Sequence, residues 1–416
     1  MSKEHYIASL DIGTQNIRAA QAKVSSDTGK LSLIGASVVE ARGIRRGVIV
    51  DIEEAVSCIS QGLEKLERMT GVPVVVANIS IGGNHISSQG SHGVIAVSRA
   101  DGEIGESDIV RVVDASQVIA LPQNREVLHV FPKSFSLDGQ SGIKDPSGMS
   151  GIRLEVDTII VQAGLPFVKN LTRAVLQSGL EIGELVLAPL ASAEAVLSKR
   201  QKDLGVCLVD LGAGTTSLAI YEEGDLLHTA VIPIGQMHIT NDIAIGLRCS
   251  IETAEKVKLA FGHCDTKNIS KEQEIDLSKF DDSEEQTTMR SYVVEIIEAR
   301  LEEIFDYVSK ELKKIQRDGK LPSGTVLTGG GAFLPGCVEF AKKHLRLPAT
   351  LGRPQNIETI IDRVDGPDFA TAVGLLLWGG QYSSSVGKSQ LSGMVNQILK
   401  NPSFGKMKQW LKSFLP

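Results

Sequence analysis

One phrase occurs twice in this chain: an apolar run ends in an aspartate, and glycine and threonine follow at once. The copies are Tyr6–Thr14 (YIASLDIGT) and Leu208–Thr216 (LVDLGAGTT). Glycine lets the backbone turn sharply and approach a ligand closely, and the N–H groups and hydroxyls beside it suit an oxygen-rich anion such as phosphate. An aspartate can serve a phosphate through a hydrated Mg2+, which keeps most of its waters and takes one or two carboxylates. The repeat predicts two related lobes, each supplying half of a nucleotide clamp.

A third run of this kind lies at Thr325–Ala332 (TVLTGGGA). It is predicted to be a strand that opens into glycines, with a helix starting at Ala332–Pro335. Consecutive glycines have little structural use unless something packs flat against the backbone. Each acid-glycine phrase taken alone could be a hairpin turn. The prediction of a nucleotide clamp therefore depends on all three runs together.

The composition narrows the class of protein. With 416 residues, of which 42% are hydrophobic and 22% charged, the chain is long enough for two or three globular domains. The net charge of −7 argues against a nucleic-acid partner, because no excess of Lys and Arg is present to neutralise phosphates. Five scattered cysteines without a C-x-x-C pair favour a reducing compartment over a disulfide framework or a zinc site. No apolar stretch reaches the ~18 residues that span a bilayer, so any membrane contact is expected to be peripheral.

In this order, the three runs resemble the phosphate-1, phosphate-2 and adenosine motifs of the superfamily that holds actin, the heat-shock chaperone ATPases and the sugar kinases. Val76–Gly83 and Asp368–Gly374 resemble its two hinge segments. The resemblance implies an α/β, actin-like fold of two duplicated ribonuclease H-like lobes, with ATP and Mg2+ in the cleft between them. It assigns to the nucleotide Asp11, Gly13, Thr14, Gln15, Asn16, Asp210, Gly212, Gly214, Thr215, Thr216, Gly329, Gly330, Gly331 and Ala332. Asp11 and Asp210 are the expected Mg2+ residues, acting through water, and Asp210 could also orient an attacking water.

Two further residues are assigned to the nucleotide by the same resemblance. Thr253–Lys258 (TAEKVK) is similar to the superfamily helix whose E-x-x-K reaches the adenosine, which gives Glu255 and Lys258 that role. An acid and a base three positions apart on a helix also pair with each other at the surface. The sequence leaves both interpretations open.

Hydrolysis is a separate question from binding. The superfamily supplies the partner of the attacking nucleophile from a residue near Leu187–Ala193, and nothing there is an obvious base. Phosphoryl transfer chiefly needs positioned charge and an aligned nucleophile. We therefore expect an ATP-binding scaffold with slow or no hydrolysis, and an active ATPase or kinase of the same fold is the alternative.

The segment after the first hinge carries a more specific phrase. Ile143–Glu155 (IKDPSGMSGIRLE) is similar to the inserted 1C subdomain of the FtsA family, the bacterial actin homologues that tie the division ring to the membrane. Further FtsA-like features are His129, Pro132, Arg42–Ala55 and Ile297–Phe305, so the resemblance covers roughly Tyr6 to Gly380. A loop rich in Pro and Gly is commonly only a loop, and the sequence alone shows no partner surface there.

The FtsA resemblance implies a subdomain order. The expected divisions are 1A at 1–83, 162–198 and 367–382; an SHS2-like 1C at 84–161; 2A at 199–245 and 287–366; and 2B at 246–286. The apolar spacing predicts helices at Glu106–Ile119, Phe167–Leu176 and Met289–Ile315, the last packed in the core. Lys267–Glu285 is expected to be a solvated loop.

The end of the chain is predicted to be a flexible linker at 383–403 followed by an amphipathic membrane-targeting helix at 404–416. On a helix at roughly 100° per residue, its apolar side chains share one face and its lysines flank them. These residues are Phe404, Met407, Trp410, Leu411, Phe414 and Leu415, with Lys406, Lys408 and Lys412. The alternative is a helix that docks on its own protein.

The family resemblance also implies partners. They are the C-terminal tail of FtsZ, bound through 2B; a second copy of the chain, in a filament; later membrane proteins of the divisome, bound through 1C; and anionic membrane lipids. The implied place is the cytoplasmic face of the inner membrane, at the septum. A pilus-assembly adaptor of the FtsA-like group is the alternative, because it shares the nucleotide clamp.

Overall fold

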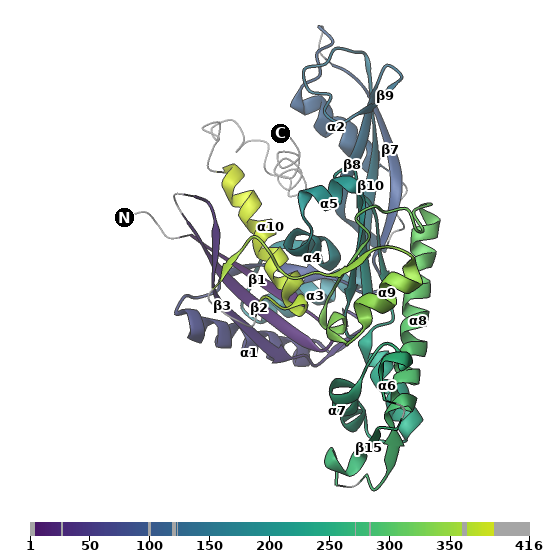
Figure 1. The fold of residues 1–416 in the computed structure, drawn as a ribbon. Coiled ribbons are helices and arrows are strands. Elements are labelled where there is room, and N and C mark those ends of the chain that lie inside the picture. Colours follow the sequence, from purple (N-terminus) through teal and green to yellow (C-terminus); the bar gives the residue numbers. More distant parts are fainter. Residues whose placement is uncertain are drawn as a thin grey trace.

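Two lobes lie side by side, and a smaller unit projects from each end of the molecule (Figure 1). The computed structural model describes residues 5–25, 28–98, 101–118, 122, 124–270, 272–282, 284–359 and 364–386. The predicted amphipathic helix at 404–416, and the linker before it from residue 387, lie outside the described residues. Within the described part of the chain, none of the helices is both long and apolar enough to cross a bilayer.

The first lobe is built on a six-stranded sheet in the order β11-β6-β1-β2-β3-β19. β1 and β3 each pair antiparallel with β2, whereas β6 pairs parallel with β1 and β11 pairs parallel with β6. The strands are β1 (His5–Ile12), β2 (Asn16–Val24), β3 (Leu31–Glu40), β6 (Val76–Ile81), β11 (Glu181–Leu187) and β19 (Glu358–Thr359). One face is covered by α1 (Ile52–Thr70), which begins where the Asp51 carboxylate accepts the Glu54 N–H and ends at Gly71 in a left-handed conformation.

The second lobe repeats this arrangement. Its five-stranded sheet has the order β14-β13-β12-β17-β18, again with three antiparallel strands followed by two parallel ones. The strands are β12 (Val206–Leu211), β13 (Thr216–Glu222), β14 (Asp225–Ile232), β17 (Thr325–Thr328) and β18 (Ala349–Leu351). The helices are α5 (Lys199–Leu204), α6 (Gln236–Leu247), α7 (Ile251–Phe261), α8 (Arg290–Lys314) and α9 (Cys337–Leu345). The matching strand orders confirm the predicted pair of duplicated lobes, and α8 confirms the predicted long core helix.

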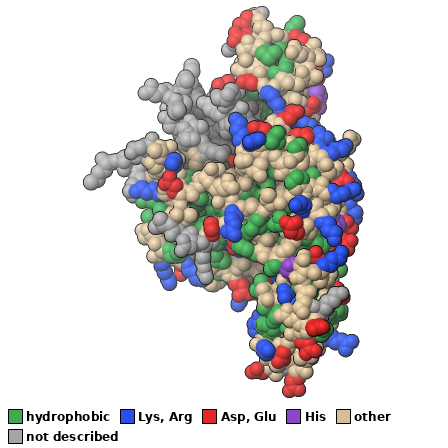
Figure 2. All heavy atoms as spheres, viewed as in Figure 1, with side chains coloured by type: hydrophobic (Ala, Val, Ile, Leu, Met, Phe, Trp, Pro, Cys, Tyr) green, Lys and Arg blue, Asp and Glu red, His purple; other side chains and the backbone are tan. Residues whose placement is uncertain are grey.

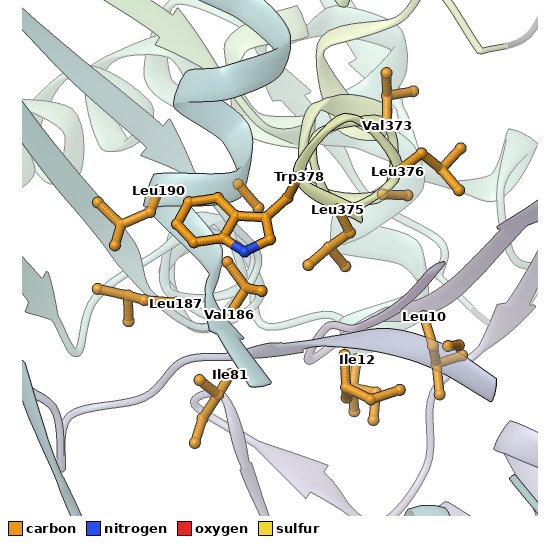
Figure 3. Close-up of a cluster of buried hydrophobic side chains, with 14 of the residues drawn as sticks. Leu10, Ile12, Ile81, Val186, Leu187, Leu190, Val373, Leu375, Leu376 and Trp378 are labelled. Atoms are coloured by element: carbon orange, nitrogen blue, oxygen red, sulfur yellow. The ribbon is translucent and has the colours of Figure 1, made fainter. Parts of the chain in front are cut away.

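Two helices of the first lobe form the seam between the lobes. They are α4 (Ala188–Val196) and α10 (Ala370–Val386). A Cβ on Gly374 of α10 would overlap the backbone carbonyl of Ala191 on α4, so only glycine allows the two helices to approach this closely. Figure 3 shows Trp378 of α10 among the buried side chains of Leu187 and Leu190. α10 extends to Val386, past the expected start of the linker at residue 383.

The unit at one end is a four-stranded sheet, β7-β10-β8-β9, covered by one helix. Its elements are β7 (Ser87–Ala96), α2 (Glu106–Gln117), β8 (Arg125–Leu137), β9 (Gln140–Ile143) and β10 (Arg153–Gly164). It has a separate core that includes Val112, Leu154 and Val156, and the FtsA-like phrase 143–155 connects β9 to β10. It joins the first lobe through α3 (Leu165–Gln177) and also touches the second lobe, where the Ser88 hydroxyl donates to the Thr229 carbonyl at 2.7 Å.

The unit at the other end lies between α7 and α8 and is more ordered than the sequence predicted. The expected solvated loop contains β15 (Glu274–Asp276), paired with β16 (Thr287–Met289), and the short helices Thr266–Asn268 and Leu277–Lys279. Ile275 and Leu277 are fully buried there. Because most of the residues around Ile275 and Leu277 are charged, the local composition predicted a solvated loop and not two buried side chains.

Figure 2 shows basic and acidic side chains interspersed over the face of the molecule in view.

His85 lies at the junction of the first lobe and the projecting sheet, and it is buried and uncharged. Its ring stacks on Phe167 with 4.6 Å between centroids, and its Nδ1 accepts the Gly164 N–H at 3.3 Å. Burial lowers the pKa of His85 from 6.5 to about 4. Between these two values the unfolded chain binds the proton and the folded chain does not, so stability must fall as the pH falls through this window.

We expect the free energy of unfolding to drop by up to about 3 kcal/mol from pH 7 to pH 4.5 through this group, at about 1.4 kcal/mol per pKa unit. Chemical denaturation at both pH values would measure the drop. The His85→Asn variant, whose amide oxygen can still accept from Gly164, should show a smaller drop. An equal drop in the parent chain and in the variant would show that His85 does not cause the loss of stability at low pH.

Candidate nucleotide site between the lobes

A cavity opens between the lobes, where the two acid-glycine turns face each other. It contains about 790 Å³ of space not filled by atoms, including open solvent at its mouth. Its lining comes from both lobes and consists of Asp11–Asn16, Arg18, Gly47, Ser80, Gly82, Ala188, Asp210, Gly212–Thr215, Ser217, Gly329, Gly330, Asp368 and Thr371.

The two turns have the same geometry. Each joins two antiparallel strands, β1 to β2 and β12 to β13, and the N–H of its first glycine donates to a carbonyl three residues later. Gly13 donates to Asn16 at 3.1 Å, and Gly212 donates to Thr215 at 2.9 Å. A Cβ on Gly13 would lie 2.7 Å from the Asn16 carbonyl oxygen, and one on Gly212 would lie 2.8 Å from that of Thr215. Glycine is therefore required at both positions by the turn itself.

The turns also touch each other across the cleft. A Cβ on Gly214 would lie 2.6 Å from Thr14 Oγ1, so the two turns pack directly against each other. Thr14 Oγ1 accepts the Gly47 N–H at 3.0 Å. Behind the second turn, the N–H of Gln236 donates to the Gly212 carbonyl at 3.0 Å. The first residue of α6 thus holds the second turn through a backbone hydrogen bond.

Asp11, near the end of β1, faces the cavity and is held by one hydroxyl. The Ser80 side chain donates to Asp11 Oδ1 at 2.8 Å and accepts the Ile12 N–H at 2.9 Å. Burial raises the pKa of Asp11, and the nearby Arg18 guanidinium opposes the shift. Arg18 itself pairs with Asp368 at 3.0 Å. The carboxylate is therefore short of compensating charge on the side that faces the cavity.

Asp210, near the end of β12, is the matching acid of the second lobe. Ser192 donates to its Oδ2 at 3.0 Å, and Thr371 Oγ1 lies 3.4 Å from the same oxygen. Burial raises the pKa of Asp210 to about 6, and the charge of Asp11 adds to the shift. Two desolvated acids at one cavity gain from a hydrated divalent cation, for which carboxylate and water oxygens are the preferred donors. The residues present therefore fit Mg2+.

The glycine run that follows β17 forms another wall of the cavity. Gly329 has φ +82, and a Cβ there would overlap Asp210 Oδ1. Gly330 meets no atom within 4 Å on that side, so its face is open to the cavity. Gly331 and Ala332 are buried behind it, and Gly331 packs on the Gln236 side chain. The helix predicted to start at Ala332 is only a 3-10 turn over Gly330–Phe333, and α9 begins at Cys337 after Pro335 and Gly336.

Five of the residues assigned from the sequence do not line the cavity: Gly331 and Ala332, which lie behind the glycine wall, and Thr216, Glu255 and Lys258. Thr216 is fully buried and donates to the Ile234 carbonyl at 2.8 Å. Lys258 is buried and pairs with Glu255 at 2.6 Å, and both bond to the Thr240 hydroxyl. The role of Glu255 and Lys258 toward adenosine stays a prediction.

The structure adds residues that the sequence did not single out as ligands or supports. They are Ser80, Ser192, Thr371, Arg18, Gly47 and Gly235. A Cβ on Gly235 would lie 2.5 Å from the Gly212 carbonyl oxygen, which explains the glycine before α6. Ser80 and Thr371 lie in the hinge segments Val76–Gly83 and Asp368–Gly374, whose resemblance to the superfamily could have pointed to them. Ser192 lies in Leu187–Ala193, the segment near which the superfamily places the partner of the nucleophile, but nothing there pointed to a hydroxyl bonded to Asp210.

The fold is that of actin-like proteins. A solved PilM-PilN type IV pilus biogenesis complex aligns with 90% of this chain and 98% of its own at TM-score 0.65 and 16% identity. MreB5 of Spiroplasma citri bound to ADP aligns with 92% of this chain and 99% of its own, at TM-score 0.55 and 14% identity. Together with the duplicated sheets and paired turns, these likenesses make the chain a member of the actin-like class.

Sequence comparison gives the family. The profile described as Cell division protein FtsA matches residues 207–374, and the SHS2 domain inserted in FtsA matches residues 83–162. The FtsA of Pseudomonas aeruginosa is 36% identical over 98% of this chain and 97% of its own. The FtsA of Bacillus subtilis is 39% identical over 90% of this chain and 84% of its own. The chain belongs to the FtsA family of cell division proteins, which decides against the pilus adaptor.

Proposed function

We propose that this chain binds ATP with Mg2+ between its lobes and acts as an actin-like scaffold of cell division at the cytoplasmic face of the inner membrane. The observation that carries the first part is the meeting of two glycine turns and two desolvated acids, one of each from each lobe, at a single cavity. Among solved relatives of the same fold, MreB5 of Spiroplasma citri is bound to ADP in one structure and to AMPPNP in another.

Each wall of the cavity has a distinct task in this proposal. The turns Gly13–Asn16 and Gly212–Thr215 offer backbone N–H groups and hydroxyls to the phosphates. Asp11 and Asp210 would hold Mg2+ through its waters, and the bound ion would supply positive charge between these acids and the phosphates. Gly330 leaves an open face for the nucleoside, and Gly329 beside it packs closely on Asp210.

We expect little hydrolysis. The carboxylates that line the cavity are Asp11, Asp210 and Asp368, and Asp368 is already paired with Arg18. No histidine, lysine or cysteine is among the lining residues that the structure describes. An active ATPase remains the alternative, and single-turnover loss of labelled γ-phosphate would reveal it.

Membership of the FtsA family supports the proposed partners. The proposed binder of the FtsZ tail is the 2B unit at 246–286, together with the adjoining start of α8. Its support is a set of exposed apolar side chains, among them Ile251, Leu259 (74% exposed) and Tyr292. The four-stranded unit is the proposed contact for later divisome proteins, and copies of the chain would assemble into filaments. The tail at 404–416 is the proposed contact with anionic lipids.

The membrane part is tested by removing the tail. Deletion of 404–416, or Trp410→Glu alone, is expected to release the protein from anionic liposomes without loss of ATP binding. Each buried apolar side chain contributes about 1.5–3 kcal/mol and each lysine about 1 kcal/mol, but ordering the tail costs about 1–2 kcal/mol per residue. One tail should therefore bind reversibly, and many tails on one polymer should bind durably. Flotation measures this, and equal flotation of the truncated chain would rule the anchor out.

A further inference from the structure

The two acids of the cavity occupy equivalent positions in the two lobes, yet they are held differently. The parallel register of β1 with β6 brings Ser80 beside Asp11, and that of β12 with β17 brings Thr328 beside Asp210. Ser80 donates to Asp11. Thr328 does not donate to Asp210, because its hydroxyl donates to the Pro367 carbonyl at 2.9 Å. The two lobes therefore differ at this position: the hydroxyl beside the acid donates to it in the first lobe but not in the second.

Asp210 receives its hydrogen bonds from the opposite lobe instead. Ser192 on α4 and Thr371 on α10 both approach Oδ2, and their own oxygens are 2.9 Å apart. Both side chains are buried. On its other side, Asp210 Oδ1 lies against the Cα of Gly329, where no side chain fits. The carboxylate is fixed from two directions.

The hydroxyls are themselves held rigidly. Gly374 of α10 packs against the carbonyl of Ala191, which directly precedes Ser192, so the two helices cannot slide without breaking this contact. Thr371 lies one turn before Gly374 on the same helix. The close contact of Gly374 on α10 with the Ala191 carbonyl on α4 thus sets the distance between the two hydroxyls.

We propose that Ser192 and Thr371 are positioning residues for the Mg2+-nucleotide site: they orient Asp210 toward the waters of the ion and tie this acid of the second lobe to α4 and α10 of the first. The inference rests on the proposed function. If the only need were a hydrogen bond to the buried Asp210, the Thr328 hydroxyl of the same lobe could supply it, because Thr328 is beside Asp210 in register. A hydroxyl from the other lobe would then not be required. Partners of this kind behind a metal site typically contribute 10- to 100-fold to metal affinity.

The test is calorimetry of ATP binding with Mg2+ and with EDTA, on the full chain. We expect Ser192→Ala/Thr371→Val to lose about 10- to 100-fold in affinity with Mg2+ and to match the parent chain in EDTA and in melting temperature. Thr371→Ser should keep most of the affinity. Thr325→Val is the matched control, because this hydroxyl is equally buried and has no partner. Ser192→Ala alone, which removes one oxygen, carries the same expectation if the double variant does not fold.

Unchanged affinity with Mg2+ in Ser192→Ala and in the double variant would overturn the inference. An equal loss with Mg2+ and with EDTA would also overturn it, because that result marks a structural role. If the parent chain itself fails to bind ATP with Mg2+, the proposed function falls first and the inference falls with it.

Discussion

The Gly330→Val variant is expected to fold like the parent chain and to lose most of its affinity for ATP. No atom lies within 4 Å of the position that a Cβ would take, so the new side chain enters the cavity and strains nothing in the free protein. Overfilling a packed site costs about 1–3 kcal/mol, which is about 5- to 150-fold in affinity. Calorimetry with Mg2+ and a melting curve would measure both effects.

Gly90→Val is the matched control for this variant. Gly90 lies on β7, outside the cavity, and it also meets no atom within 4 Å. It should bind ATP as the parent chain does. If Gly330→Val also binds ATP unchanged, the glycine run does not face the nucleotide.

The Gly374→Ala variant is expected to lose about 3 kcal/mol or more of stability, since its Cβ would overlap backbone atoms of α4 that cannot move independently. The better helix propensity of alanine returns only about 1 kcal/mol. Chemical denaturation would measure the difference.

Gly380→Ala on the same helix separates packing from propensity. Its Cβ would meet only the flexible end of Leu31, so we expect a change within about 1 kcal/mol. Equal effects at Gly374 and Gly380 would show that the close approach in the seam is not what requires glycine.

The two acid-glycine turns could be predicted from the sequence because everything they need is local. The acid, the glycine and the strand on either side are neighbours along the chain, and the turn closes on itself through Gly13 and Asn16. The same acid-glycine phrase occurs a second time in the chain, which strengthened the prediction. For the same reason the fold class followed from the order of a few short runs.

The hydroxyl groups that hold Asp210 beside the second turn could not be predicted in this way. Ser192 and Thr371 meet at Asp210 only because two helices, 179 positions apart at these residues, cross at Gly374. Thr216 does not line the cavity because its hydroxyl, one residue beyond the turn, donates to the Ile234 carbonyl of its own lobe. The buried Ile275 and Leu277 were missed because they belong to the core of the second lobe, which residues distant in sequence build and which their charged neighbours do not indicate.

We expect the nucleotide-loaded, actin-like chain to assemble on a membrane through its tail. Electron microscopy of the full chain on a monolayer containing anionic lipid, with ATP and Mg2+, tests it most directly. We predict filaments on the lipid with the parent chain, none with Gly330→Val, and none on the lipid after deletion of 404–416. Filaments that form equally without nucleotide, or an absence of the parent chain from the lipid surface, would contradict the account.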